Sequence, residues 1–402
     1  MQSVRVLQVI DSLGMGGAET WLLELLRLWA DSGEVKMDFL LTGGHRAIFD
    51  EEAQRLGAKL YYVAYNRRRL AQFTTAFRRI LKDGRYDAVH DHQDCSAGWH
   101  LLMGSGALPG TRIVHVHNPS FGIRHTYGVT PSRRAVATVG KYLVGRHATY
   151  LTGTSRQILT EYGFDAPAFR QLAKAALYCG FNPRRFAGDV GAAKISLRRE
   201  FGWPDEAKVI LVAGRMDESP DLGHPRNHKN TGFAVDVALA CMRRDASVRA
   251  IFAGKTTTAL SILEDRIAKA EMNGRFAFPG VRTDIETIML GADILLFPSR
   301  GEGLGMVAVE AQAAGLPVLA STAVPRECVV IPGRVDFRDI GDGPDLWASD
   351  VLRLASLPRD AVNDNRRVAA SAFSVENSAR NLAALYRGES LPPDSGGNPQ
   401  GS

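Results

Sequence analysis

The feature that most constrains the fold is an apolar strand that runs directly into a glycine-rich loop and an amphipathic helix. Val4–Ile10 is almost continuously apolar, which is typical of a strand buried on both faces of a parallel sheet. The loop Ser12–Gly17 follows, and Ala18–Ala30 then carries apolar residues at helical spacing. A strand, a glycine loop and a helix in this order form the opening of a Rossmann-like unit.

The same alternation continues along the chain and then begins a second time. Further strands are expected at Met37–Thr42, Leu60–Val63, Ala88–His92, Ile113–His117 and Tyr150–Thr154, with helices between most of them. A turn at 178–183, marked by Gly and Asn-Pro, separates them from a second series. The strands expected in that series are Lys208–Gly214, Val248–Ala253, Ile294–Pro298 and Pro317–Ala320. The helices expected between and after them are Asn230–Arg243, Ile285–Leu290, Met306–Ala314, Leu346–Ala355 and Val375–Tyr386. The pattern predicts an α/β protein with two Rossmann-like halves and parallel sheets.

Composition and charge agree with two folded domains that have different partners. The 402 residues are 45% apolar and 23% charged, which excludes a disordered or fibrous protein. The net charge of +6 is uneven, with +9 in residues 1–188 and −3 in residues 189–402. A basic first half favours an anionic surface or ligand as its partner.

The cysteines and apolar runs indicate the compartment. Four cysteines are widely spaced and show neither a disulfide nor a zinc-binding pattern: Cys95, Cys179, Cys241 and Cys328. We expect no signal peptide and no transmembrane helix, because no apolar run approaches 18 residues. The expected location is the cytoplasm, with a peripheral position on the inner face of the membrane as the alternative.

The most informative stretch for chemistry is Phe297–Ser321, which reads FPSRGEGLGMVAVEAQAAGLPVLAS. Glu302 lies in a glycine-rich loop after a strand, and Glu310 lies about two turns into the following helix. A helix N-terminus beside a glycine loop suits a phosphate, because its amides are free and its dipole is positive there. A carboxylate further along such a unit can bind two vicinal hydroxyls, as acidic residues do for ribose.

This stretch resembles the E-x7-E block of the retaining glycosyltransferases of family 4, with Gln312 where Met is commoner. The resemblance implies the GT-B fold, with two Rossmann-like domains facing each other across a cleft. It also implies that Glu310 binds the ribose and Glu302 the sugar of a nucleotide-sugar donor. Backbone amides of Leu304, Gly305 and Met306 would contact that donor.

Three other segments carry the same resemblance, which spans residues 4–387. Gly16 and Gly17 match the family's GG-x-E loop, where glycine lets the backbone approach the donor diphosphate. CGFNPRRF at 179–186 resembles its hinge, and the segment from Phe373 to Tyr386 resembles its final helix, which crosses back to the first domain. The expected boundaries are an acceptor domain at 1–183, a donor domain at 184–370, the returning helix at 371–388 and a disordered tail at 389–402.

Arg215 and Lys229 form a second chemical element. Arg215 ends a strand and Lys229 precedes a helix, and the matching residues of the family clamp the two donor phosphates. Two placed cations can stabilise a departing diphosphate as a divalent metal would. We see no D-x-D metal motif, so we expect neither a metal nor a cofactor. The thirteen residues between the two cations exceed the usual length and could form a lid or contact the donor sugar.

Histidines form a third element. By strand alternation His115 and His117 face the same side, and the resemblance places His117 near the donor sugar and the acceptor. His90 and His92 lie at the tip of the preceding strand and are weaker candidates. We interpret the acidic residues around His92 as part of a loop and not as a metal site.

Residues 66–82 carry six cations, no anion and a helical row of apolar side chains. This pattern is typical of an interfacial helix on anionic lipid. A helix packed on its own sheet and a nucleic-acid patch are the alternatives. No nucleic-acid-binding module is recognised, so no nucleic-acid partner is expected.

The resemblance therefore implies a retaining, metal-independent glycosyltransferase of hexosyltransferase type. Its donor would be a UDP-sugar or GDP-sugar, and its acceptor a glycan, a lipid-linked molecule or a small molecule. The alternatives are a nucleotide-sugar epimerase of GT-B architecture, which needs no acceptor, and a non-catalytic sugar-nucleotide-binding protein, which would bind without transfer.

Overall fold

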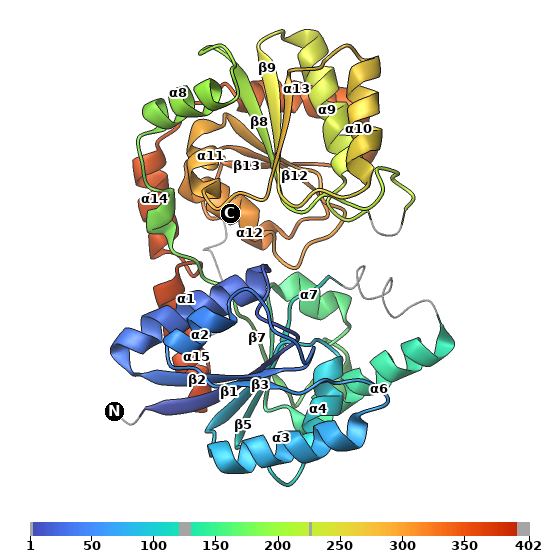
Figure 1. The fold of residues 1–402 in the computed structure, drawn as a ribbon, viewed down its shortest axis with the longest axis vertical. Coiled ribbons are helices and arrows are strands. Elements are labelled where there is room, and N and C mark those ends of the chain that lie inside the picture. Colours follow the sequence, from blue (N-terminus) through green and yellow to red (C-terminus); the bar gives the residue numbers. More distant parts are fainter. Residues whose placement is uncertain (1–2, 120–129, 225–226, 392–402) are drawn as a thin grey trace. The chain divides into compact units, whose positions relative to one another are not determined.

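A computed structural model describes residues 3–119, 130–224 and 227–391. The chain divides into two compact units, Met1–Asn182 with Ala372–Ser402 and Pro183–Ser371 (Figure 1). Each unit contains its own parallel sheet with helices, so the predicted α/β fold with two Rossmann-like halves is confirmed. Most of the tail that we expect to be disordered, 392–402, lies outside the described residues.

The first unit is built on a seven-stranded sheet in the order β3-β2-β1-β4-β5-β6-β7. Every neighbouring pair is parallel. The strands are β1 (Val4–Ile10), β2 (Val35–Leu41), β3 (Leu60–Tyr62), β4 (Ala88–Asp91), β5 (Thr111–Val116), β6 (Tyr150–Gly153) and β7 (Ala173–Ala176). The chain leaves β1 toward one edge of the sheet and returns beside β1 at β4. The carboxyl ends of β1 and β4 are therefore a switch point, where ligands bind in open α/β sheets.

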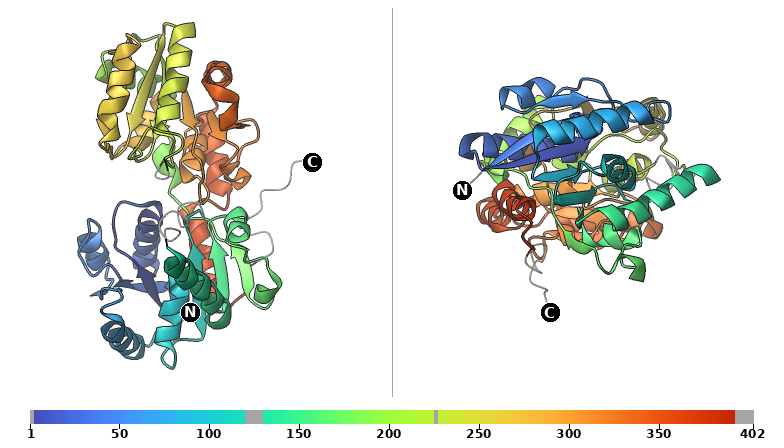
Figure 2. Two further views of the ribbon diagram at one scale, coloured as in Figure 1. Left: turned by 90° about the vertical axis from the view of Figure 1, so that its right-hand side faces the viewer. Right: turned by 90° about the horizontal axis from the view of Figure 1, so that it is seen from below.

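Helices cover both faces of this sheet. They are α1 (Gly17–Ser32), α2 (Asp50–Arg55), α3 (Leu70–Gly84), α4 (Ser96–Gly104), α6 (Pro131–His147), α7 (Arg156–Glu161), the short 3₁₀ helix η1 (Pro167–Phe169) and α15 (Val375–Tyr386). The last of these comes from the C-terminal end of the chain and contacts α1 and β1. Figures 1 and 2 show this helix, in red, among the blue elements of the first unit. The Trp21 indole donates to Ser378 Oγ at 2.9 Å, so the returning helix is part of this unit's core.

The second unit has a six-stranded parallel sheet in the order β10-β9-β8-β11-β12-β13. Its strands are β8 (Lys208–Ala213), β9 (Val248–Ala253), β10 (Phe276–Gly280), β11 (Ile294–Phe297), β12 (Val318–Ser321) and β13 (Val335–Arg338). Its helices are η2 (Pro183–Phe186), α8 (Val190–Glu200), α9 (Thr231–Arg244), α10 (Ala259–Lys269), α11 (Ile285–Gly291), α12 (Met306–Ala313), η3 (Arg326–Cys328), η4 (Ile340–Asp342), α13 (Gly343–Leu354) and α14 (Ala361–Ala370). The switch point of this sheet lies between β8 and β11.

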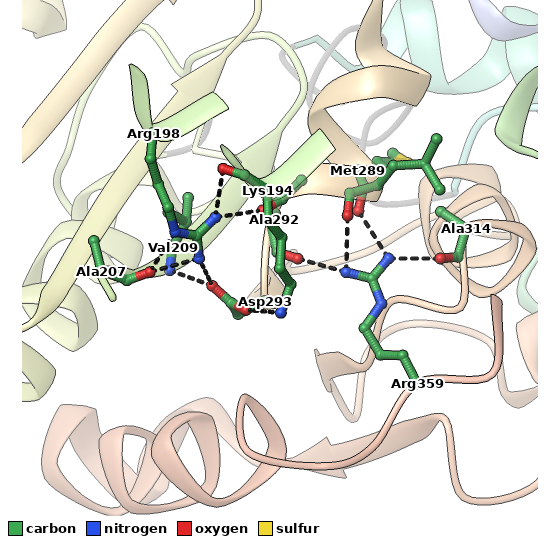
Figure 3. Close-up of polar contacts among 11 residues, drawn as sticks. Lys194, Arg198, Ala207, Val209, Met289, Ala292, Asp293, Ala314 and Arg359 are labelled. Atoms are coloured by element: carbon green, nitrogen blue, oxygen red, sulfur yellow. Dashed lines mark hydrogen bonds and ion pairs between the residues drawn. The ribbon is translucent and has the colours of Figure 1, made fainter. Parts of the chain in front are cut away.

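Two arginines, Arg198 buried and Arg359 partly buried, tie the second sheet to its helices (Figure 3). Arg198 on α8 pairs with Asp293 at 2.7 Å, and Asp293 also accepts the backbone N–H of Val209 at the start of β8. Arg359 donates to the last carbonyls of α11 and, at 2.6 Å, to the Ala314 carbonyl that ends α12. A cation at the C-terminal ends of two helices complements their dipoles. These contacts fix α12 relative to β11.

The apolar row of the basic segment 66–82 is part of the first unit's core. Phe73 and Phe77 are fully buried, and Ile80 and Leu81 nearly so, in a cluster with side chains of β1 and β2. The alternative of a helix packed on its own sheet therefore describes α3, and these apolar side chains are not available to lipid. The cations of the segment remain exposed. None of the helices within the described ranges combines the length and the apolar character needed to span a bilayer.

Candidate functional site

The predicted donor residues gather at the carboxyl edge of the second sheet. The strands β8 and β11 are neighbours, with Ile210 beside Ile294. Arg215 follows β8, and Glu302 follows β11, so both loops leave the sheet at the same edge. Arg215 is exposed to solvent there. The topology thus brings together two loops that are 87 residues apart in the chain.

The structure pairs Lys229 directly with Glu302. The Lys229 Nζ atom lies 2.6 Å from Glu302 Oε1, and the Ser299 hydroxyl donates to the same oxygen at 2.5 Å. The two charged side chains are 33% and 14% exposed, so solvent and a ligand can still reach the ammonium group. An ammonium group and a carboxylate are therefore held in contact at the switch point. The first suits the phosphates of a nucleotide sugar, and the second suits its sugar hydroxyls.

Asp217, in the segment between the two cations, holds Lys229 in place. Its carboxylate is buried and accepts the backbone N–H groups of His228 and Lys229 at 2.8 and 3.0 Å. It also accepts the N–H and hydroxyl of Thr231, at 3.1 and 3.2 Å. The Thr231 amide is the first of α9, and the other two amides lie just before the helix, so the Asp217 carboxylate fixes the loop that carries Lys229 to the start of α9. Sequence reasoning missed this role, because only the fold shows which backbone amides lie near Asp217.

The N-terminus of α12 is open by contrast. Its N-cap is Gly305, which has no side chain to accept the first amides and adopts a φ of +89°. A Cβ at this position would lie 2.9 Å from the Phe297 ring, so the close approach as well as the φ requires glycine. Leu304 and Gly305 are buried and Met306 is partly exposed. The first amides of α12 have no intrahelical acceptor and are the ones suited to a phosphate or a sugar oxygen.

Glu310 lies on the same helix and does not contact Glu302. Burial raises the pKa of its carboxyl to about 7, an effect that Arg185 opposes and Glu286 reinforces. These two neighbours form an ion pair of 3.0 Å with each other. The Glu310 side chain accepts no hydrogen bond from any residue in the described part of the chain, so its oxygens are free for a ligand.

In the first unit, the glycine loop leads into α1. Gly16 is the N-cap of this helix, and the Glu19 side chain lies over it, since a Cβ there would be 2.1 Å from Glu19 Oε2. Gly17 has open space where a Cβ would point. Gly17 is therefore the position at which the backbone can approach a ligand, while Glu19 covers Gly16. Burial raises the pKa of the Glu19 carboxyl.

Four histidines gather in one cluster against Trp21 of α1. His90 and His115 are parallel within 10°, and the rings of His115 and His117 stack at 4.1 Å. His115 and His117 therefore face the same side, as the strand alternation predicts. The Trp21 indole packs against all four rings, including that of His92. Asp94, by contrast, accepts the backbone N–H of His117 at 2.9 Å and stabilises a loop.

The comparisons with known proteins now decide the family. The model of the glycosyl transferase 4-like domain matches residues 16–171, and the model of glycosyl transferases group 1 matches residues 207–356. Each model falls on one of the two units described above. The chain belongs to the family 4 glycosyltransferases.

Relatives of this glycosyltransferase include EpsF of Bacillus subtilis (strain 168), whose name describes it as a glycosyltransferase. The two chains are 28% identical over 362 residues, which is 88% of each. The D-inositol 3-phosphate glycosyltransferase of Corynebacterium urealyticum is 25% identical over 334 residues, 77% of this chain and 73% of that one. Among solved structures, Anabaena HepE in complex with UDP and glucose superposes with a TM-score of 0.72 at 18% identity, covering 94% of this chain and 98% of the other. The fold is therefore GT-B.

The glycosyltransferase has one group of side chains with metal-ligand chemistry among its described residues. Ligand atoms of His90, His92 and His115 all lie within 4.8 Å of one another. A tetrahedral zinc ion with bonds of about 2.0–2.1 Å needs ligand nitrogens roughly 3.3 Å apart, with ring planes pointing toward it. The rings of His90 and His115 are nearly parallel instead, and both nitrogens of His92 are already hydrogen-bonded, to Gln8 and His117. His90 Nε2 and both nitrogens of His115 are buried without a hydrogen-bond partner among the described residues. Because His92 has no free lone pair, the three residues do not form a complete set of metal ligands.

Sequence reasoning also missed Gln8 and Ser299. Gln8 is fully buried on β1 and bonds to His92 and Tyr386. A polar residue inside the apolar run Val4–Ile10 was the available signal. Ser299 gave no signal beyond its place near Glu302.

Proposed function

We propose that this glycosyltransferase transfers a hexosyl group from a nucleoside-diphosphate sugar, foremost a UDP-sugar, with retention of the anomeric configuration. The observation that carries the proposal is the contact between Lys229 and Glu302 beside the uncapped N-terminus of α12. This edge of the sheet offers a cation, a carboxylate that can accept hydrogen bonds, and free amides. It is the place where GT-B relatives would hold the nucleotide-sugar donor.

Each part of the donor has a matching group. The diphosphate is bound by Arg215, Lys229 and the first amides of α12, because all of these carry full or partial positive charge. The Glu310 carboxylate accepts the ribose hydroxyls. Glu302 accepts hydroxyls of the transferred sugar. HepE, which has the same fold, was solved with UDP and glucose, and this favours uridine over guanosine.

Family membership supports retention of the anomeric configuration. The Glu302 Oε1 atom already accepts from Lys229 and Ser299, and in the proposal Glu302 accepts hydrogen bonds and forms no bond to the sugar. In the proposed step, the bond between the anomeric carbon and the diphosphate oxygen breaks. The acceptor oxygen bonds to the same face of the sugar and gives its proton to the leaving diphosphate.

The charge that develops on the diphosphate needs stabilisation, and we propose that Arg215 and Lys229 supply it without a divalent metal. The acceptor is a glycan, a lipid-linked molecule or a small molecule, with His117 near the reacting groups. We also propose that the exposed cations at Arg67–Arg69 draw the enzyme to an anionic membrane surface, where a lipid-linked acceptor would lie.

The experiment is a transfer assay with UDP-sugars and GDP-sugars, an extracted acceptor pool and a chelator of divalent metals. We expect transfer to persist in the chelator, and NMR of the product to show the donor's anomeric configuration. Lys229→Ala and Glu310→Gln should lose at least about 100-fold in kcat/KM, which corresponds to the roughly 3 kcal/mol of a lost charged contact. Lys269→Ala, an exposed cation at the end of α10, should retain wild-type activity.

Inverted product would refute retention, and loss of transfer in the chelator would refute metal independence. Near-normal turnover in both Lys229→Ala and Glu310→Gln would refute the proposed site. Isomerisation of the donor without any acceptor would instead identify an epimerase, and binding of UDP without transfer to any acceptor would identify a non-catalytic protein.

A further inference from the structure

A chain of hydrogen bonds runs from the returning helix to the carboxyl edge of the first sheet. The Tyr386 hydroxyl lies 2.9 Å from both Gln8 Nε2 and His90 Nδ1. Gln8 Oε1 lies 2.9 Å from His92 Nε2, and His92 Nδ1 lies 2.8 Å from His117 Nε2. Gln8, His90 and His92 are buried, whereas His117 is partly exposed. The chain therefore begins in the core and ends at a side chain that a ligand can reach.

The proton positions along this chain follow from Gln8. Its Nε2 atom also lies 3.3 Å from the Met37 sulfur, which can only accept, so the amide nitrogen must face Met37 and Tyr386. The amide oxygen then faces His92 and accepts from His92 Nε2–H. A neutral imidazole has one N–H, so His92 Nδ1 is bare and accepts from His117 Nε2–H.

The rings are neutral because the surrounding side chains keep most water away from them, although an edge of His117 remains accessible. Burial lowers the pKa of His92 well below its usual value, and the neighbouring histidines lower it further. Burial also lowers the pKa of His117 to about 3. Each ring therefore carries a single N–H near neutral pH, and the assignment of one tautomer sets the next.

We infer that Gln8 and His92 are positioning residues that fix His117 as its Nε2–H tautomer and leave the Nδ1 lone pair as an acceptor for a hydroxyl. The role in catalysis rests on the proposed function, in which that hydroxyl belongs to the donor sugar or the acceptor. The tautomer itself rests only on the hydrogen bonds above. The Cys179 thiol lies 4.0 Å from His117 Nδ1, and burial raises the pKa of that thiol to about 12, so it stays protonated and can donate to the Nδ1 lone pair.

The first test is long-range proton–nitrogen NMR of the imidazole rings in the full-length protein with ¹⁵N-labelled histidine. The His117 signals are identified by their absence in His117→Gln. We expect a protonated Nε2 and a bare Nδ1 for His117 and for His92. A protonated Nδ1 at His117 would overturn the inference, and this measurement requires no substrate.

The second test combines tautomer and kinetics in three variants. His92→Leu removes the acceptor, so His117 should populate both tautomers, and kcat should fall about 10–100-fold while the donor KM changes less than about twofold. His92→Asn places a side-chain oxygen near the former Nδ1. It should restore most of kcat and most of the Nε2–H tautomer of His117. His115→Leu is the matched control, because it removes a ring from the same cluster that lies outside the chain of hydrogen bonds.

The outcomes separate the inference from the proposed function. If His92→Leu loses activity while His117 keeps its tautomer, or if His92→Asn rescues neither readout, the positioning role is refuted. If the His115→Leu control mixes the two His117 tautomers as strongly as His92→Leu does, then ring packing, and not the chain of hydrogen bonds, sets the tautomer. If the wild-type protein transfers no sugar but shows the expected tautomer, the proposed function fails and the hydrogen-bond assignment stands.

Discussion

At the scale of single residues, Glu310 has the property that most directly links burial to ligand binding. Its carboxyl is removed from water by α12 and its surroundings, which raises its pKa to about 7. A group with a raised carboxyl pKa is protonated below that value in the folded protein and charged above it. Ribose hydroxyls donate more strongly to the charged form than to the acid. The proposed ribose contact should therefore depend on pH near neutrality.

We predict that affinity for UDP-glucose increases as the pH rises from about 6 to about 8, because Glu310 loses its proton in this interval and the bound donor stabilises the charged form. Isothermal titration calorimetry at several pH values measures the affinity for UDP-glucose. UDP-glucose is the suitable probe because its diphosphate is esterified on both sides and does not titrate in this range. In Glu310→Gln the pH dependence should disappear along with most of the affinity. A pH-independent affinity in the wild-type protein would contradict the ribose contact.

At the scale of elements, the departure of Gln312 from the family pattern has a structural cause. Gln312 is fully buried on α12, and its amide nitrogen donates to the carbonyls of Ala308 and Cys328, both at 2.8 Å. Its amide oxygen accepts the N–H groups of Val330 and Ile331 at 2.8 and 2.9 Å. The amide therefore fastens the loop after η3 to the helix that carries Glu310.

We predict that Gln312→Met, although it restores the commoner family residue, lowers the free energy of unfolding by at least about 3 kcal/mol. Methionine leaves two buried N–H groups and a carbonyl without partners, and each such loss costs roughly 1–3 kcal/mol. Urea unfolding monitored by circular dichroism measures the change. Gln72→Met, at an exposed position of α3, is the control and should stay within about 0.5 kcal/mol of wild type. Equal stability of Gln312→Met and wild type would show that the loop repacks without the amide.

The elements also show which parts of the structure the sequence could predict. Val4–Ile10 has the expected bounds, because a continuous apolar run can only be buried. The short edge strands β7, β10 and β13 were not expected, since Ala173–Ala176 reads AKAA and forms a strand only because β6 pairs with it. Spacing and resemblance located Glu302 and Lys229, but the contact between them depends on the order of the strands in the sheet. The roles of Asp217 and Gln8 depend on that same arrangement in space.

At the scale of the whole molecule, the uneven charge of the sequence is carried by cations on the surface. The first half has a net charge of +9, and Arg67–Arg69 are all exposed before α3 begins. Arg78 differs from these residues, because its Nε donates to the Met103 carbonyl at 2.8 Å and it supports the fold. Because the apolar face of α3 is in the core, an attraction to lipid through this segment has to be electrostatic. Such an attraction is screened by salt, whereas an inserted apolar face would keep the protein bound.

We predict that the protein co-sediments with vesicles of phosphatidylcholine and phosphatidylserine at about 0.05 M salt and is released at about 0.5 M, where the Debye length is only a few ångströms. The triple variant R67Q/R68Q/R69Q should bind at least about tenfold more weakly, since each cation near an anionic surface contributes about 1 kcal/mol. The control R199Q/R243Q/K269Q removes the same charge from exposed helix positions of the second unit. If the control weakens binding as much as the triple variant, net charge and not this segment draws the protein to lipid. If binding survives high salt, an apolar contact outside α3 must be responsible.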